Sequence, residues 1–274
     1  MYANLRQSDY WLCLAHSNVI SVAAVSHIYA SQGYFLVKQF ASQDECDALL
    51  AITGSFHKKW LARNHAFYQS RAINSSGLTE PDLPNAEQRA GLFRVIGSGK
   101  LVNLIRPIFQ APPVFVNTQL FFDPTNAQQT NYWHRDIQYD KTIEEQKQAL
   151  NGPEAIHCRL ALKRERGIEL IPGSHRRWDR DDELDVRLGQ NGRHHHEALN
   201  SGVSVALNVG DMLVFSAAMI HRGLYGLNRM ALDILFCENA PQCLPYINHR
   251  AQPGPDMQHV IETPSVFASF SNTE

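Results

Sequence analysis

The pattern of apolar and polar positions divides the chain into two parts that meet near residue 113. In the first part, residues 19–31 predict a helix and "GYFLVKQF" predicts a short strand behind a glycine turn. "SQDECDALL" predicts a second helix, because Glu45 follows Ser42 by three positions in a capping-box pattern. "SGKLVNLIRPIFQ" predicts a helix broken by Pro107, and residues 74–91, rich in Asn, Ser, Gly and Pro, predict a loop.

The second part consists of short runs rich in β-branched, aromatic and aliphatic residues, each bounded by Gly, Pro, Asn or Asp. The runs are "PVFVNTQLFFD", "QQTNYWHRDIQ", "AIHCRLALK", "GIELIPG", "VSVALNV", "DMLVFSA" and "RMALDILFC". Gly210 and Asp211 predict a turn between two of these strands, and a helix is expected near residues 142–150.

Many short strands after a helical beginning favour a mainly β fold with flanking helices, of the double-stranded β-helix type, a cupin-like jelly roll. The sequence has no internal repeat and no clean linker. We therefore expect a single domain over residues 1–274, with a helical part at about 1–110 and a jelly-roll core at about 113–240.

Composition narrows the possible partners and compartments. The 274 residues carry a formal net charge of −2, so no global field attracts nucleic acid, although a local basic patch stays open. Five cysteines without a Cys-x-x-Cys pair suit neither a disulfide framework nor a thiolate zinc site, and favour a reducing compartment such as the cytoplasm.

The membrane is not an expected partner, because no apolar run approaches the length that crosses a bilayer. The N-terminal segment "YWLCLAHSNVISVAAVSHIYA" is fairly apolar, but His16, Asn18 and His27 interrupt it. A secretory signal is the weaker interpretation of this segment.

Thirteen histidines invite a search for metal ligands, and "NYWHRDIQYD" holds the best candidates. If this stretch is a strand, His134 and Asp136 point to the same face, as metal ligands or as a hydrogen-bonding pair at a strand end. An Fe(II) site of the 2-His-1-carboxylate type needs one more ligand. His221, just after a predicted strand, is the best third ligand, since a late strand of a rolled sheet returns beside an early one.

An anionic co-substrate of such a site needs a cation nearby. Arg229 stands eight residues after His221, at the start of the next predicted strand. Its guanidinium group could hold a carboxylate in a bidentate fork.

At this point the sequence resembles the phytanoyl-CoA dioxygenase family of Fe(II)/2-oxoglutarate oxygenases. The resemblance rests on "WHRD", then "LALKRERGIELIPGSH", "GDMLVFSAAMIHRG" and "NRMAL", and on the early "YASQGYFLVKQFASQDECDALL". It spans roughly residues 25–237. The aspartate is retained, unlike in related halogenases, where a small residue frees that coordination position.

The resemblance implies roles for six residues. His134, Asp136 and His221 would bind Fe(II), and Arg229 would hold the distal carboxylate of 2-oxoglutarate. Gln119 would touch the co-substrate. Arg159 departs from the family, which often has an aromatic or hydroxyl residue there, and would either add a second contact to the anion or line the pocket. The gap from His221 to Arg229 is shorter than is usual in the family.

Strand alternation suggests substrate contacts. Tyr132 and Gln138 would share the face of His134 and would meet the substrate, whereas Trp133 and Arg135 would pack behind it.

Several other polar stretches have competing interpretations. The charge-mixed segment 176–200 is either an exposed, salt-bridged segment or a lid whose Trp178 meets the substrate. "RHHHE" is a rival metal cluster, but adjacent strand residues alternate in direction, so a solvated loop is favoured. His175 in "IPGSH" is expected in a structural turn, and "KRER", residues 163–166, in a solvated turn.

The predicted function is hydroxylation of a small molecule by a monomeric or weakly oligomeric Fe(II)/2-oxoglutarate oxygenase that consumes O2 and releases succinate and CO2. One alternative is an oxygenase that demethylates nucleic acid. Such enzymes usually carry a second arginine soon after the arginine that binds the co-substrate, and "NRMALDILFC" lacks a second one after Arg229. The other is a non-catalytic, cupin-like binding protein, against which the complete set of ligands argues.

Overall fold

The computed structural model describes residues 11–12 and 22–268 of the chain. Residues 13–21, which include the start of the predicted 19–31 helix and much of the segment weighed as a secretory signal, lie outside the described residues.

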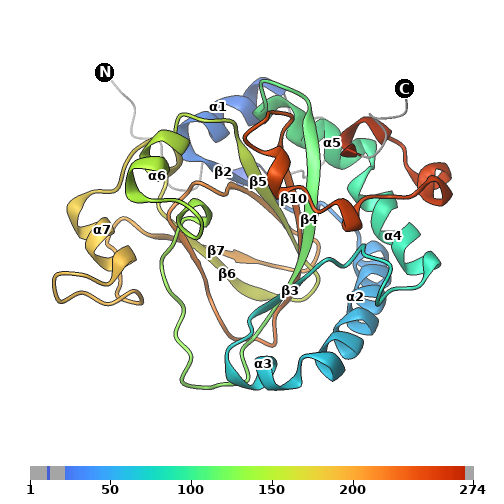
Figure 1. The fold of residues 1–274 in the computed structure, drawn as a ribbon, viewed down its shortest axis with the longest axis horizontal. Coiled ribbons are helices and arrows are strands. Elements are labelled where there is room, and N and C mark those ends of the chain that lie inside the picture. Colours follow the sequence, from blue (N-terminus) through green and yellow to red (C-terminus); the bar gives the residue numbers. More distant parts are fainter. Residues whose placement is uncertain (1–10, 13–21, 269–274) are drawn as a thin grey trace.

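The described strands form two facing sheets, and this confirms the predicted mainly β jelly roll (Figure 1). Neighbouring strands are antiparallel except β1 and β2. The larger sheet has the order β1 (Trp11–Leu12), β2 (Tyr34–Val37), β8 (Met212–Ser216), β5 (Ala155–Ala161), β10 (Met230–Glu238), β4 (Pro113–Phe122) and β3 (Asn74–Ser76). The smaller sheet has the order β7 (Val203–Leu207), β6 (Glu165–Leu170) and β9 (His221–Gly223).

The helices flank these sheets, with α2 and α4 on one side of the view and α6 and α7 on the other (Figure 1). Their bounds are α1 (Val22–Gln32), α2 (Gln43–Arg63), α3 (His65–Ser70), α4 (Ala86–Ile96), α5 (Gly99–Ile105), α6 (Ile143–Ala149) and α7 (Asp181–Leu188). The described helices include no span long and apolar enough to cross a bilayer.

Local sequence signals explain most helix ends. The predicted capping box opens α2, since Ser42 Oγ accepts from the Glu45 amide and the Glu45 carboxylate accepts from the Ser42 amide. Pro107 lies in the 3₁₀ turn that follows α5, as expected. The predicted loop at 74–91 is partly wrong, because it contains β3 and the start of α4, which Asn85 and Gln88 cap in the same reciprocal way.

The main hydrophobic core lies between the larger sheet and the helices. It includes Phe115 and Leu120 of β4, Leu160 of β5, Phe236 of β10, and Leu49, Phe56, Phe93 and Leu101 from the helices. A smaller apolar cluster, with Leu36, Ile168, Leu213 and Phe215, lies between the two sheets. Burial of one such side chain contributes about 1.5–3 kcal/mol, so the main core holds the helices on the larger sheet and the smaller cluster holds the two sheets together.

Strand alternation gives the larger sheet a charged inner face. In β5, Cys158 and Leu160 belong to the helix-side core, whereas His157 and Arg159 line the space between the sheets. Asp233 of β10 lies directly across from Arg159 in the ladder and lines the same space. Because ionisable side chains are costly to bury, their presence on this inner face indicates a candidate functional site between the sheets.

The prediction of a strand at "QQTNYWHRDIQ" is wrong, because most of this stretch is irregular. Only His134 pairs, in a single bridge with His221, and a 3₁₀ turn, η3 (Asp136–Gln138), follows. β9 has three residues and offers little edge for pairing. Asp136 is therefore held by its amide, which donates to the Ala217 carbonyl, and not by a strand ladder.

Candidate metal centre and co-substrate pocket

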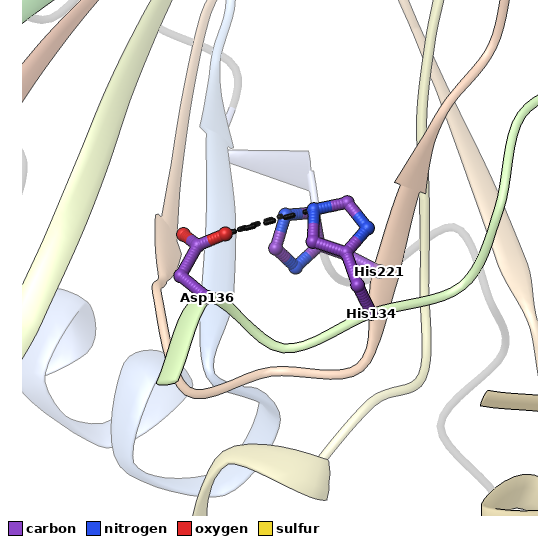
Figure 2. A group of neighbouring side chains, drawn as sticks. All are labelled: His134, Asp136 and His221. Carbon is purple, nitrogen blue, oxygen red and sulfur yellow. Dashed lines mark ion pairs between the residues drawn. The ribbon is translucent and has the colours of Figure 1, made fainter. Parts of the chain in front are cut away.

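The three candidate metal ligands converge at one end of the space between the sheets (Figure 2). His134 and His221 exchange both backbone hydrogen bonds of their bridge, and this sets their rings 4.2 Å apart between centroids. Asp136 Oδ1 lies 3.6 Å from His134 Nε2 and 3.9 Å from His221 Nε2. The donor atoms of all three residues lie within 4.8 Å of one another, a spacing that a single metal ion can span.

Backbone carbonyls fix the tautomers of both imidazoles. His134 Nδ1 lies 3.1 Å from the Tyr132 carbonyl, and His221 Nδ1 lies 3.0 Å from the Met219 carbonyl. Because a carbonyl oxygen only accepts, each Nδ1 donates and each Nε2 keeps its lone pair toward Asp136. Imidazoles that bind metals are oriented in this way.

Burial and neighbouring charges set the protonation states. Burial lowers the pKa of His221 to about 3, and burial also lowers the pKa of His134, so both rings are neutral at pH 7. Burial alone would raise the pKa of Asp136, but the hydrogen bond and charge of His157 outweigh it and hold the pKa well below its usual range. Two neutral imidazoles and a carboxylate fit the ligand set of non-heme Fe(II).

A chain of charged side chains extends from Asp136 along the inner face of the larger sheet. His157 Nε2 lies 2.7 Å from Asp136 Oδ2, and His157 Nδ1 lies 3.2 Å from Asp233 Oδ2. Arg159 donates to Asp233 at 3.2 Å and, through two nitrogens, to Glu165 at 2.8 Å each. We call these five residues the pocket network.

His157 and Asp233 were not predicted as site residues from the sequence, and Glu165 was assigned to the wrong environment. Their signal is the alternation of charged and apolar positions in "AIHCRLALK" and "RMALDILFC". Glu165 was expected in a solvated turn, but it is only 1% exposed because it begins β6 and faces Arg159.

A cavity of about 1370 Å³ opens from the candidate metal centre. Its wall includes the three candidate ligands together with Gln119, Arg159, Arg229 and Tyr132. The rest of the wall carries charged and aromatic residues, among them Asp140, Lys141, Glu154, Arg176 and Tyr246.

Arg229 lines this cavity, and its guanidinium group is only partly paired within the protein. Its Nε donates to the Phe122 carbonyl at 3.1 Å and lies 3.3 Å from Asp123 Oδ1, while its buried Nη2 has no hydrogen-bond partner. Burial, with the charge of Arg159, lowers the pKa of Arg229 to about 10, which leaves it protonated at pH 7. An unpaired buried guanidinium nitrogen is suited to a carboxylate.

The other two predicted co-substrate residues differ in what they offer. Gln119 lies on β4, lines the cavity and pairs across the ladder with Asp233. Arg159 is fully buried, and Nε, Nη1 and Nη2 all contact carboxylates of the protein. Arg159 thus lines the pocket without a free fork for an anion.

Of the predicted substrate contacts, the structure brings only Tyr132 to the cavity wall, where its hydroxyl lies 2.8 Å from that of Tyr139. Gln138 lies off the wall because the η3 turn ends the strand alternation, and its Oε1 accepts from the Arg135 amide and from Arg187. Trp178 also lies off the wall and packs against Lys147 and Arg187.

A second set of buried charges lies behind the centre. As predicted, Trp133 and Arg135 are fully buried behind the ligands. Arg135 and Arg187 bind opposite oxygens of Asp179 at 2.9 and 2.6 Å. Arg135 also donates to the carbonyls of Ser174, Arg177 and Ala218. We call Arg135, Asp179 and Arg187 the rear network.

The rival metal cluster is not supported. The three histidines of "RHHHE" are exposed, and the rings of His194 and His196 stack on each other. Across the part of the chain that the structure describes, only His134, Asp136 and His221 form a group of donors placed to hold a metal ion. His175 is buried beside Tyr29 and Gly33, in the turn where a structural role was predicted.

A jelly roll that gathers two imidazoles and a carboxylate in its interior defines the class of non-heme iron oxygenases. Within that class, the phytanoyl-CoA dioxygenase (PhyH) family matches residues 29–225, and the protein belongs to this family. It is therefore a dioxygenase-type oxidoreductase, and Fe(II), 2-oxoglutarate and O2 are the cofactors of its class.

Solved structures share the fold at low sequence identity. AviO1 from Streptomyces viridochromogenes Tue57 is 18% identical, with a TM-score of 0.55 over 82% of this chain and 98% of that chain. EctD from S. alaskensis is 15% identical, with a TM-score of 0.55 over 82% and 80%. SnoK, a carbocyclase from nogalamycin biosynthesis, is 17% identical, with a TM-score of 0.52 over 80% and 84%. No curated protein matches the sequence.

Proposed function

We propose that the protein is an Fe(II)/2-oxoglutarate-dependent oxygenase that hydroxylates a small molecule and releases succinate and CO2. His134, Asp136 and His221 hold the iron. The observation that carries the proposal is the approach of two neutral imidazoles, each with Nε2 directed at the same carboxylate oxygen.

The co-substrate is held by Arg229. Its unpaired Nη2 is the group that would donate to the distal carboxylate of 2-oxoglutarate, and Gln119 supplies a further polar contact on the same wall. Bound iron and 2-oxoglutarate supply the oxidative chemistry, while the protein binds and orients the reactants. Arg159 contributes by holding Asp233 and Glu165 in place.

The size of the cavity supports a substrate that is a separate small molecule. Ligand pockets commonly measure about 300–1,000 Å³, and the space here, at about 1370 Å³, leaves room for a second molecule beside 2-oxoglutarate. Tyr132, Tyr139 and Tyr246 line it, and the exposed parts of Tyr139 and Tyr246 give it an aromatic wall.

The charges on the cavity wall outside the co-substrate region argue against a nucleic-acid substrate. Outside the co-substrate region, the wall carries more carboxylates than cations. The carboxylates are Asp140, Glu145, Glu154 and Glu238, and the cations are Lys141 and Arg176. A phosphate backbone would meet more like than unlike charge there. We therefore favour a neutral or cationic small molecule.

We further propose that the enzyme works in the cytoplasm as a monomer or weak oligomer. The four described cysteines are free thiols, which suits a reducing compartment.

The test measures succinate from purified protein supplied with Fe(II) and 2-oxoglutarate under air, alone and with a pool of metabolites. Succinate above the level of His134→Ala is the expected result. Equal succinate from both proteins under every condition would favour the non-catalytic binding protein. Stimulation only by methylated single-stranded DNA would favour the demethylase.

A further inference from the structure

We propose that His157, held in turn by Asp233, is a positioning residue that makes Asp136 present one oxygen to the iron. The inference rests on the proposed iron site and adds how that site keeps its geometry.

The two oxygens of Asp136 have different surroundings. Oδ2 accepts the hydrogen bond from His157 Nε2 at 2.7 Å. Oδ1 faces the free Nε2 atoms of His134 and His221 at 3.6 and 3.9 Å. A metal bound between the imidazoles would meet Oδ1, because His134 and His221 direct their Nε2 atoms at that oxygen. The hydrogen bond from His157 occupies one lone pair of Oδ2 and holds that oxygen toward β5, so it disfavours binding through both oxygens.

His157 itself is tightly fixed. It is 5% exposed, and both of its ring nitrogens contact carboxylates, Asp136 on one side and Asp233 on the other. Its ring also stacks on Phe215, with centroids 4.8 Å apart and an interplanar angle of 11°. Phe215 meets His221 edge-on at 5.1 Å, so the same ring supports two sides of the site.

Asp233 anchors this arrangement to the sheets. It lies in the middle of β10, across from Arg159 of β5, and Oδ1 accepts from Arg159 at 3.2 Å. Arg159 is in turn bound by both oxygens of Glu165 on β6. The chain of contacts thus connects a carboxylate in a short 3₁₀ turn to three strands from both sheets.

The arrangement has a chemical consequence. A 2-His-1-carboxylate centre leaves positions open for a bidentate co-substrate and O2 only if the carboxylate uses a single oxygen. The hydrogen bond from His157 to Oδ2 favours this mode of binding through Oδ1 alone. Hydrogen-bonding partners of metal ligands typically change metal affinity about 10–100-fold when removed.

The test compares His157→Phe, which keeps a ring beside Phe215 but removes both hydrogen bonds, with His157→Gln, which keeps an amide donor. Co(II) affinity and the Co(II) absorption spectrum are measured on protein without co-substrate, after thermal unfolding shows that each variant is folded. We expect His157→Phe to bind Co(II) about 10–100-fold more weakly with an altered spectrum, and His157→Gln to recover part of both.

His57→Phe is the matched control, because His57 lies in a separate aromatic cluster with Trp60 and Phe122. Its Co(II) affinity should stay within about 2-fold of the original protein, as for a substitution away from the ligands. A folded His157→Phe with unchanged affinity and spectrum would overturn the inference.

If His157→Phe does not fold, Asp233→Asn is tested in its place, because it keeps the shape of the side chain that holds His157 and removes its charge. Weaker Co(II) binding is expected, and unchanged binding would overturn the inference. Failure of the unsubstituted protein to bind Co(II) or Fe(II) would instead overturn the proposed function.

Discussion

The pocket network and the rear network begin at adjacent residues and behave differently. Asp136 enters the pocket network, and its side chain is 31% exposed toward the cavity that it lines. Arg135 enters the rear network, where its side chain and that of Asp179 are 0% exposed. Both networks contain buried arginines and carboxylates, so buried charge alone does not mark a functional site. The difference lies in which network reaches the cavity.

The two networks also hold the same short segment from opposite sides. His157 contacts Asp136 from the cavity side, while Asp179 and three backbone carbonyls hold Arg135 from behind. We expect loss of the first to affect metal binding and chemistry, and loss of the second to affect mainly the stability of the fold.

The largest expected effect is loss of the ligands themselves. His134→Ala or Asp136→Ala should abolish succinate formation while the protein still folds, because each removes a metal ligand and leaves the cores intact. Succinate assays and thermal unfolding check this. His194→Ala, in the exposed "RHHHE" loop, is the control and should keep full turnover. Normal turnover in either ligand variant would mean that the metal binds elsewhere.

Asp179→Ala tests the rear network. It leaves Arg135 and Arg187 buried without their shared carboxylate, so the free energy of unfolding should fall by about 3–5 kcal/mol. Denaturant titration measures this loss. Turnover per folded molecule should stay near that of the original protein, and a loss of turnover without a loss of stability would contradict the division between the networks.

Arg229→Ala should raise the concentration of 2-oxoglutarate at half-saturation about 10–100-fold, since a hydrogen bond to a charged group contributes about 1.5–3 kcal/mol. The maximal rate should change less. Initial rates across a 2-oxoglutarate series check this, with Arg166→Ala, an exposed arginine, as the control. An unchanged half-saturating concentration would show that another group binds the carboxylate.

Trp178→Ala should have the smallest effect. Trp178 packs against Lys147 and Arg187 and lies off the cavity wall, so only about 1 kcal/mol of stability should be lost. The KM for substrate, once one is known, should stay within about 2-fold. A large rise in KM would mean that the segment around α7 reaches the substrate after all.

The sequence predicted the fold and the three candidate ligands because their signals are local or ordered along the chain. His134 and Asp136 form a short motif, and His221 follows an apolar strand. The contacts within the pocket network could not be predicted, because they depend on the register of the strands: Asp233 meets Arg159 only when β10 pairs with β5. The prediction that Gln138 faces the pocket was wrong, because it extended the strand alternation of side chains into residues that form the η3 turn. The single domain and the roles of the site residues, those of the three candidate ligands, Arg229 and Gln119 among them, stay predictions.

The bridge between His134 and His221 makes the geometry of the candidate iron site depend on the folding of the whole jelly roll. Two donors distant in sequence meet through paired amides and carbonyls, so their spacing is set only once the late strand docks beside the earlier segment. Ferrous ion would therefore bind the closed barrel in preference to the open chain, and should raise its melting temperature by mass action.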